Sequence, residues 1–135
     1  MAELTVKATT ENLDAINDFV NAQLEAAECP MKLMMQIDLA LEEAYVNIAH
    51  YAYHPGTGEA TVRCETAGGN VVLTLVDSGR PYNPLEKEDP DVTASAQERP
   101  VGGLGVFLVK KLMDDVRYER RGDQNVLIMK KAIAG

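Results

Sequence analysis

The feature that most constrains the fold is a long amphipathic helix, which the sequence predicts over about residues 30–52. Its apolar positions follow the three-and-four spacing of a stripe facing a core, and they are Met34, Ile37, Leu41, Ala44 and Ile48. Glu43 and Asn47 lie beside this stripe, four residues apart and therefore on one face, and His50 follows three residues later. Polar groups beside a core stripe need partners, because burying them without hydrogen bonds is costly. They indicate either a solvated helix flank with one i,i+4 pair or part of a binding site.

The remaining segments predict a layered α+β fold. Alternation of apolar and polar residues predicts strands over 3–9, 59–67, 71–77, 114–120 and 125–131, and a stripe of apolar residues predicts a helix over 11–27. Gly68–Asn70 and Arg121–Asp123 are predicted as tight turns. The order is strand, helix, helix, two strands, long loop, helix and two strands. We therefore expect a two-layer sandwich in which helices cover one face of a mostly antiparallel sheet.

Composition limits the class of protein. A chain of 135 residues is expected to form one domain, residues 1–135. Its net charge of −8 argues against direct nucleic-acid binding, because phosphate contacts would oppose its own field. We see no signal peptide and no 18-residue apolar segment, so a cytoplasmic location without membrane contact is expected. Cys29 and Cys64 lack metal-ligand spacing and are expected as buried, reduced residues.

Asp77 stands at the end of a predicted buried strand, and Gly79 follows two residues later. The simpler interpretation is a turn, in which both residue types are common. The functional interpretation is recognition of a base. A carboxylate accepts a hydrogen bond from an amino group such as that at C6 of adenine, whereas guanine presents an acceptor there. Gly79 would let the backbone approach a flat base without a Cβ atom in the way.

A glycine cluster, Gly102–Gly105, opens the last predicted helix. Free N–H groups at a helix N-terminus suit phosphate oxygens, although a glycine cluster by itself equally indicates a flexible hinge. The cluster does not match the dinucleotide-binding fingerprint, because no strand precedes it. It does not match the P-loop either, because that motif ends in Lys followed by Ser or Thr.

The helix residues have chemistry that complements a phosphate site. The carbonyl oxygen of Asn47 is a neutral hard donor suited to Mg²⁺, which retains waters and is shared with phosphates. Glu43, one turn earlier, is placed to orient or deprotonate a hydroxyl or water near a γ-phosphate. His50 is either a phosphate donor or a satisfied surface histidine. The chain between residues 78 and 100 loses all periodicity, and a loop of that length is usually a lid, a binding loop or disordered.

Together these segments resemble the motifs of the Bergerat-fold (GHKL) ATP-binding family, and within it the small anti-sigma factor serine kinases of bacteria. The segment Glu43–Asn47 resembles the N box of that family. Asp77–Pro84 resembles its G1 box in the anti-sigma branch, and Gly102–Asp114 resembles its G2 box. Order and spacing agree, and the similarity covers roughly residues 3–131.

The resemblance implies a Bergerat ATP-binding fold and a role for each motif. Asn47 would hold Mg²⁺, Glu43 would be the catalytic base and Asp77 would bind adenine. The nucleotide cradle and phosphate contacts would come from the remaining site residues, which are His50, Gly79, Arg99, Gly102, Gly103, Leu104 and Gly105. The ATP lid would span about residues 85–101.

Family resemblance also implies partners. Members of this branch typically dimerise, bind a sigma factor and phosphorylate a small anti-anti-sigma protein with a STAS domain. We therefore expect an ATP- and Mg²⁺-dependent serine/threonine kinase that acts as an anti-sigma switch. The apolar residues of the strand at 3–9 are candidates to face a second copy. The alternative is a non-catalytic ATP-binding module, and an ATPase domain of a larger sensor is disfavoured by the chain length.

Two segments depart from the family pattern. His50 fills the usual basic position of the N box, and Tyr51 fills the usual histidine position. Many relatives carry Thr or Ser in the closing strand beside the adenine. Here the segment Asn125–Met129 is expected to be apolar, which would remove one hydrogen bond to the base or its waters.

Overall fold

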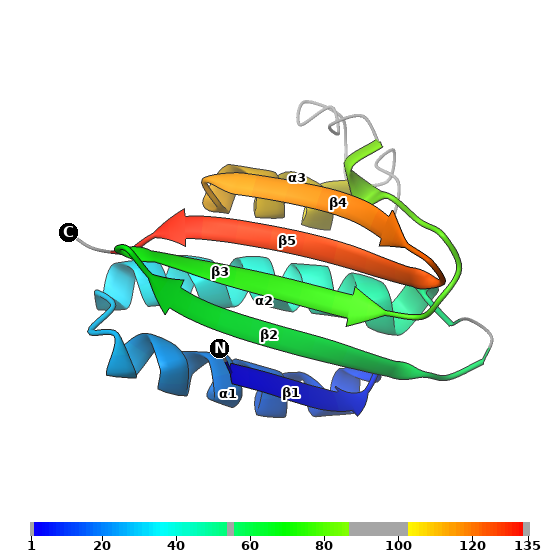
Figure 1. Ribbon diagram of the computed structural model, residues 1–135, viewed down its shortest axis with the longest axis horizontal. Coiled ribbons are helices and arrows are strands. Elements are labelled where there is room, and N and C mark those ends of the chain that lie inside the picture. The colour runs from blue at the N-terminus through cyan, green and yellow to red at the C-terminus, as the bar shows by residue number, and fades with distance from the viewer. Residues whose placement is uncertain (1, 54–55, 87–102, 134–135) are drawn as a thin grey trace.

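The computed structural model describes residues 2–53, 56–86 and 103–133, except the side chains of residue 86 and residues 103–106. Within these ranges five strands form one sheet in the order β1-β2-β3-β5-β4, and every pairing is antiparallel. The strands are β1 (Ala2–Lys7), β2 (Glu59–Ala67), β3 (Asn70–Asp77), β4 (Asp115–Arg121) and β5 (Gln124–Ala132). Figure 1 shows the helices on one side of this sheet. The two-layer α+β sandwich expected from the sequence is confirmed.

The helical layer is centred on the long helix that the sequence predicted. The α-helices are α1 (Leu13–Ala26), α2 (Met31–Tyr51) and α3 (Gly103–Leu112), and the short 3-10 helices are η1 (Thr10–Asn12) and η2 (Pro84–Glu86). α2 packs against both α1 and α3. All five residues of its predicted apolar stripe are buried, and the Met, Ile and Leu side chains among them each contribute roughly 1.5–3 kcal/mol when fully buried. None of the described helices combines the length and apolar character needed to span a membrane.

The first strand contributes to this same core. Leu4 and Val6 of β1 pack against the buried cluster between sheet and helices, whereas Glu3, Thr5 and Lys7 are exposed. Strand alternation directs both side chains towards the helices, where they are partly buried, and their contact with a second copy stays a prediction.

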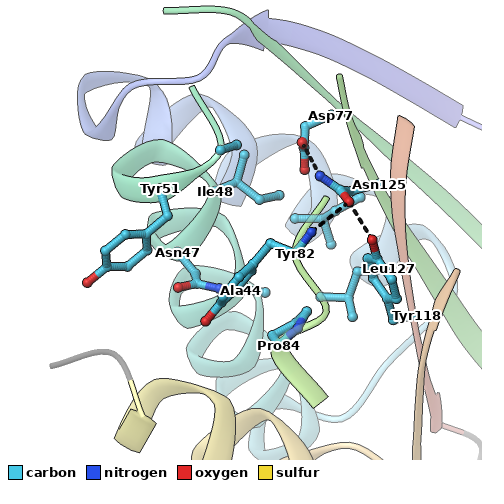
Figure 2. Close-up of a pocket in the computed structure, with 12 residues that line it drawn as sticks. Ala44, Asn47, Ile48, Tyr51, Asp77, Tyr82, Pro84, Tyr118, Asn125 and Leu127 are labelled. Atoms are coloured by element: carbon cyan, nitrogen blue, oxygen red, sulfur yellow. Dashed lines mark hydrogen bonds between the residues drawn. The ribbon is translucent and has the colours of Figure 1, made fainter. Parts of the chain in front are cut away.

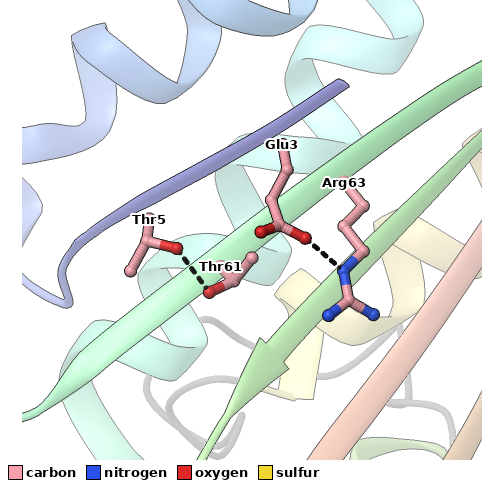
Figure 3. A network of polar contacts seen from close by, with 4 residues as sticks. All are labelled: Glu3, Thr5, Thr61 and Arg63. Carbon is pink, nitrogen blue, oxygen red and sulfur yellow. Dashed lines mark hydrogen bonds and ion pairs between the residues drawn. The ribbon is translucent and has the colours of Figure 1, made fainter. Parts of the chain in front are cut away.

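Polar pairs on the uncovered face join β1 to β2. Thr5 lies opposite Thr61, and their hydroxyl oxygens are 2.8 Å apart. Glu3 lies opposite Arg63, whose Nε donates to Glu3 Oε2 at 2.7 Å (Figure 3). Directly opposed pairs of this kind contribute to the register of edge strands.

A tight hairpin sets the register on which the site depends. Ala67 pairs with Asn70, so Gly68 and Gly69 form a two-residue loop, with φ of +59° and +78°. Positive φ at both positions fits a type I′ turn, which glycine adopts without steric cost. β3 then runs to Asp77, which lies directly opposite Asn125 of β5.

The two cysteines also behave as expected. Cys29 and Cys64 are buried and unpaired, so they act as small core residues.

Candidate functional site

A pocket of about 40 Å³ opens between the C-terminal half of α2 and the ends of β3 and β5 (Figure 2). Residues from several elements line it, including Asn47, Tyr51, Asp77, Tyr82 and Asn125. The C-terminal end of β3 lies beside the last turns of α2, so the strand residues and the helix residues line the same pocket. Two of the predicted site residues, Asn47 and Asp77, therefore share one cavity.

A second pocket of about 20 Å³ adjoins the first along α2. Glu43 lines it together with Leu85 of η2 and Val109 of α3. The residues that line both pockets are Ala44, Asn47, Pro84 and Leu127. Glu43, Asn47 and Asp77 thus belong to one continuous region, although they are 34 positions apart at most in the sequence.

The carboxylate of Asp77 is held at one oxygen. Asp77 and Asn125 are the buried polar residues among those described, at 5% and 6% exposure. Asp77 Oδ1 accepts hydrogen bonds from the backbone N of Gly79 and from Asn125 Nδ2, both at 2.9 Å. Within the described chain, no donor bonds to Asp77 Oδ2. Because a buried carboxylate normally needs partners for both oxygens, Oδ2 is suited to a ligand.

Gly79 packs against the end of α2. The backbone N of Arg80 donates to the Ala52 carbonyl at 3.1 Å, and Arg80 Nε donates to the Tyr51 carbonyl at 3.1 Å. A Cβ atom at position 79 would lie 2.3 Å from the oxygen of Ala52. This packing requires a glycine independently of any ligand, and the approach of Gly79 to a base stays a prediction.

The Tyr53 side chain links the turn after β3 to the start of β2, a role that the sequence did not indicate. Its hydroxyl donates to the Glu59 carbonyl at 2.6 Å and accepts from the backbone N of Ser78 at 2.7 Å. Burial raises the pKa of Tyr53, so the hydroxyl keeps its proton and its role as donor.

The helix residues differ in their environments. Glu43 and Asn47 are half-buried, and neither side chain has a hydrogen-bond partner in the described chain. They therefore do not form the i,i+4 pair of the solvated-flank interpretation. His50 is exposed, lines neither pocket, and stacks edge-to-face on Tyr51 with ring centroids 6.1 Å apart. The described region brings Glu43 and Asn47 to the pockets but not His50.

Several predicted site residues fall on the edge of the described chain or beyond it. Arg99, Gly102 and the lid from residue 87 onwards lie outside the described residues. Gly103 is the first residue of α3, and Leu104 and Gly105 follow in its first turn. The glycine cluster therefore begins a helix, as predicted, and that helix packs against α2.

Asn125 corrects the sequence analysis. The closing strand was expected to be apolar beside the base, but the Asn125 side chain is buried in the pocket wall. The signal was present in the alternation of β5. Asn125, Leu127 and Met129 are two residues apart along β5, so their side chains point to the same face of the sheet. Asn125 is therefore a polar residue at an inward position among apolar ones.

Comparison with known proteins gives a family match and several similar proteins. A family model for the histidine kinase-like ATPase domain matches residues 6–131. The serine/threonine-protein kinase BtrW of Bordetella bronchiseptica is 29% identical over 128 residues, which are 94% of this chain and 89% of that protein. The serine-protein kinase RsbW of Bacillus mycoides is 29% identical over 101 residues, which are 72% of this chain but only 63% of that protein.

Solved structures share the fold at lower identity. The RsbU and RsbW domains of Rv1364c from Mycobacterium tuberculosis match 98% of this chain and 33% of that chain, with a TM-score of 0.67 and 16% identity. The catalytic domain of histidine kinase ThkA matches 99% of this chain and 97% of that chain, with a TM-score of 0.58 and 16% identity. Because the family model covers nearly the whole sequence, this chain belongs to the histidine kinase-like ATPase domain family.

Proposed function

We propose that this protein is an ATP- and Mg²⁺-dependent serine/threonine protein kinase that acts as an anti-sigma-type switch. The observation that carries the proposal is the continuous region formed by two unpartnered polar side chains of α2, Glu43 and Asn47, and the half-satisfied carboxylate of Asp77. The serine-protein kinase names of the relatives support the same chemistry.

Asp77 would recognise the base. Its Oδ2 would accept a hydrogen bond from the C6 amino group of adenine, and the carbonyl of guanine at the same place would leave two acceptors facing each other. The pocket of about 40 Å³ has room for only a few waters, since each needs roughly 10–15 Å³. A purine therefore enters only if the pocket widens. Tyr82 lines this pocket, and its ring points towards α2 in Figure 2, so a bound purine would displace this ring.

Asn47 would hold Mg²⁺ through its carboxamide oxygen. No group of three His, Cys, Asp or Glu residues in the described chain could cage a metal ion. Mg²⁺ commonly combines one or two protein oxygens with waters and substrate phosphates, so a single carboxamide fits this cation. The backbone N–H groups at the start of α3, with Gly102, His50 and Arg99, would contact the phosphates. The nucleotide–metal complex supplies the phosphoryl group and neutralises part of its charge.

Glu43 would act as the base of the transfer. It lies one helical turn before Asn47 and lines the adjoining pocket, so it would accept the proton of a seryl or threonyl hydroxyl next to the γ-phosphate. A positioned base typically contributes about 10²–10⁴ in rate.

The expected phosphoacceptor is a STAS-domain anti-anti-sigma protein, and the second partner is a sigma factor held inactive in the cytoplasm, with the kinase acting as a homodimer. A phosphate adds about −1.5 to −2 charges at neutral pH, which would weaken the contact of the acceptor with this acidic chain. The second candidate function is a non-catalytic module in which ATP stabilises a partner surface. The unpartnered Glu43 favours transfer.

One experiment tests the proposal. The protein is incubated with γ-labelled ATP, Mg²⁺ and purified STAS proteins from the same genome, and label is followed on the acceptor. We expect label on a serine or threonine, a loss of about 10²-fold or more in Glu43→Gln with ATP binding retained, and little change in Glu42→Gln. Glu42 is the matched control because it is the exposed neighbouring glutamate of the same helix.

Tight ATP binding without label on any acceptor would support the binding module instead. Equal transfer by the wild type and Glu43→Gln would remove Glu43 from the role of base.

A further inference from the structure

Asn125 is hydrogen-bonded at both ends of its carboxamide. Its Nδ2 donates to Asp77 Oδ1 at 2.9 Å and to the Arg80 carbonyl at 2.8 Å. Both acceptors belong to the turn at the end of β3 that carries the proposed base-recognising carboxylate. Figure 2 shows the Asn125 side chain between Asp77 and Tyr118.

The oxygen of Asn125 accepts hydrogen bonds from β4 and from the segment that follows β3. Asn125 Oδ1 accepts from the Tyr118 hydroxyl at 2.5 Å, from Arg120 Nη1 at 3.2 Å and from the backbone N of Tyr82 at 3.3 Å. Only the carboxamide oxygen can accept three donors, so these contacts fix which end of the amide faces Asp77. The N–H groups are thereby aimed at the carboxylate.

The orientation of Asp77 follows from this arrangement. Its Oδ1 is held from one side by the backbone N of Gly79 and from the other by Asn125, which sets the plane of the carboxylate. Asp77 and Asn125 are directly opposed on β3 and β5, so the contact is built into the sheet register. A hydrogen bond to an ionised group is stronger than one between neutral groups, and burial strengthens it further.

We propose that Asn125 is the positioning residue for base recognition. It fixes the carboxylate of Asp77 so that Oδ2 is presented to the amino group of the base, and it ties that carboxylate to the Arg80–Tyr82 segment. This inference rests on the proposed ATP-binding function. It assigns the discrimination between adenine and guanine nucleotides to an Asp77–Asn125 pair rather than to Asp77 alone.

The test is the isosteric substitution Asn125→Asp, with Asn70→Asp as the matched control. Asn125→Asp keeps the acceptor end but replaces both N–H donors by an oxygen facing Asp77 Oδ1 and the Arg80 carbonyl. Asn70 is the half-buried first residue of β3, at the end of the strand away from Asp77, where its Nδ2 donates to the Gly68 carbonyl. Both variants carry the same added charge on the same sheet.

We expect calorimetry with Mg·ATP to show binding about tenfold or more weaker than wild type in Asn125→Asp at about pH 8. The preference for ATP over GTP should shrink in parallel. At about pH 5.5 the deficit relative to wild type should narrow to about threefold, because a proton shared by two adjacent carboxylates restores one donor. The ionisable side chains around the new carboxyl are Asp77 on β3, Tyr118 and Arg120 on β4, Tyr51 on α2, and Arg80 and Tyr82 after β3. Asn70→Asp should match wild type at both pH values.

A second, more conservative variant tests the same role in case Asn125→Asp does not fold. Tyr118→Phe removes one donor from Asn125 Oδ1 and keeps the ring, so it should weaken ATP binding about threefold and lower the ATP preference in the same direction. Wild-type affinity and selectivity in both variants would overturn the role of Asn125, as would a deficit in Asn125→Asp that does not change with pH. If the wild-type protein itself binds no ATP, the proposed function fails instead.

Discussion

Gly79 lies so close to Ala52 that a Cβ atom at position 79 would stand 2.3 Å from the Ala52 carbonyl oxygen and 2.7 Å from its Cβ. The next residue, Arg80, donates its backbone N–H to that same oxygen at 3.1 Å. The turn that follows Asp77 and the C-terminal end of α2 therefore form one packed unit. The base end and the proposed metal end of the site are held together by this contact.

Gly79→Ala is accordingly expected to destabilise the fold by about 1–3 kcal/mol, because the new methyl group forces the turn away from α2. Urea unfolding measures this loss. Gly68→Asn is the control, since Gly68 has φ +59°, which asparagine tolerates, and no atom lies within 4 Å of its Cβ direction. Equal stability of Gly79→Ala and wild type would contradict the packing role.

Tyr53→Phe should lower the free energy of unfolding by about 1–3 kcal/mol, because it leaves the backbone N of Ser78 and the Glu59 carbonyl without their shared hydroxyl. Tyr51→Phe is the matched control two residues earlier. Tyr51 is half-buried, and its hydroxyl has no hydrogen-bond partner in the described chain. A thermal melt in which both variants behave alike would remove Tyr53 from this role.

The buried thiol of Cys64 is expected to lower the stability of the protein at alkaline pH. Burial raises the pKa of its thiol from 9.0 to about 11 in the folded state. The folded protein therefore holds this proton more tightly, so the contribution of this thiol to stability is constant below about pH 9 and falls by up to about 1.4 kcal/mol per pH unit towards pH 11. Urea titrations over this range should show a shallower fall in Cys64→Ala. An identical slope in both proteins would contradict the buried thiol.

Asn47→Ala should remove the Mg²⁺ dependence of nucleotide binding. In the wild type, ATP is expected to bind about tenfold or more tightly with Mg²⁺ than with a chelator present, because the carboxamide oxygen completes the coordination of the cation. Asn70→Ala, which alters the far end of β3 beside the Gly68–Gly69 turn, should keep the wild-type ratio. The ratio of the two affinities is the measurement, and an unchanged ratio in Asn47→Ala would move the metal elsewhere.

The elements themselves were predictable from the sequence, because each depends on local periodicity. The stripe on α2 and the alternation of β2 and β3 fixed the helix, the strands and the hairpin at Gly68–Gly69. Glu43, Asn47 and Asp77 could be brought together only through their resemblance to family motifs, since no local pattern relates a helix residue to a strand end.

The role of Asn125 could not be predicted from the sequence, because it depends on how the strands pair. Asn125 looked like the start of an apolar strand, and its importance follows from lying opposite Asp77, a long-range register that periodicity does not specify. The surroundings of Leu4 and Val6 could not be predicted for a related reason. Alternation shows that they share a face, but not whether helices cover that face.

Calorimetric titration of Mg·ATP and Mg·GTP into the wild type and Asp77→Asn tests the central claim most directly. The account predicts one ATP bound per chain, a clear preference over GTP, and a loss of about 1–3 kcal/mol of ATP binding in Asp77→Asn together with most of that preference. No heat with Mg·ATP, or equal ATP affinity and selectivity in both proteins, would contradict it.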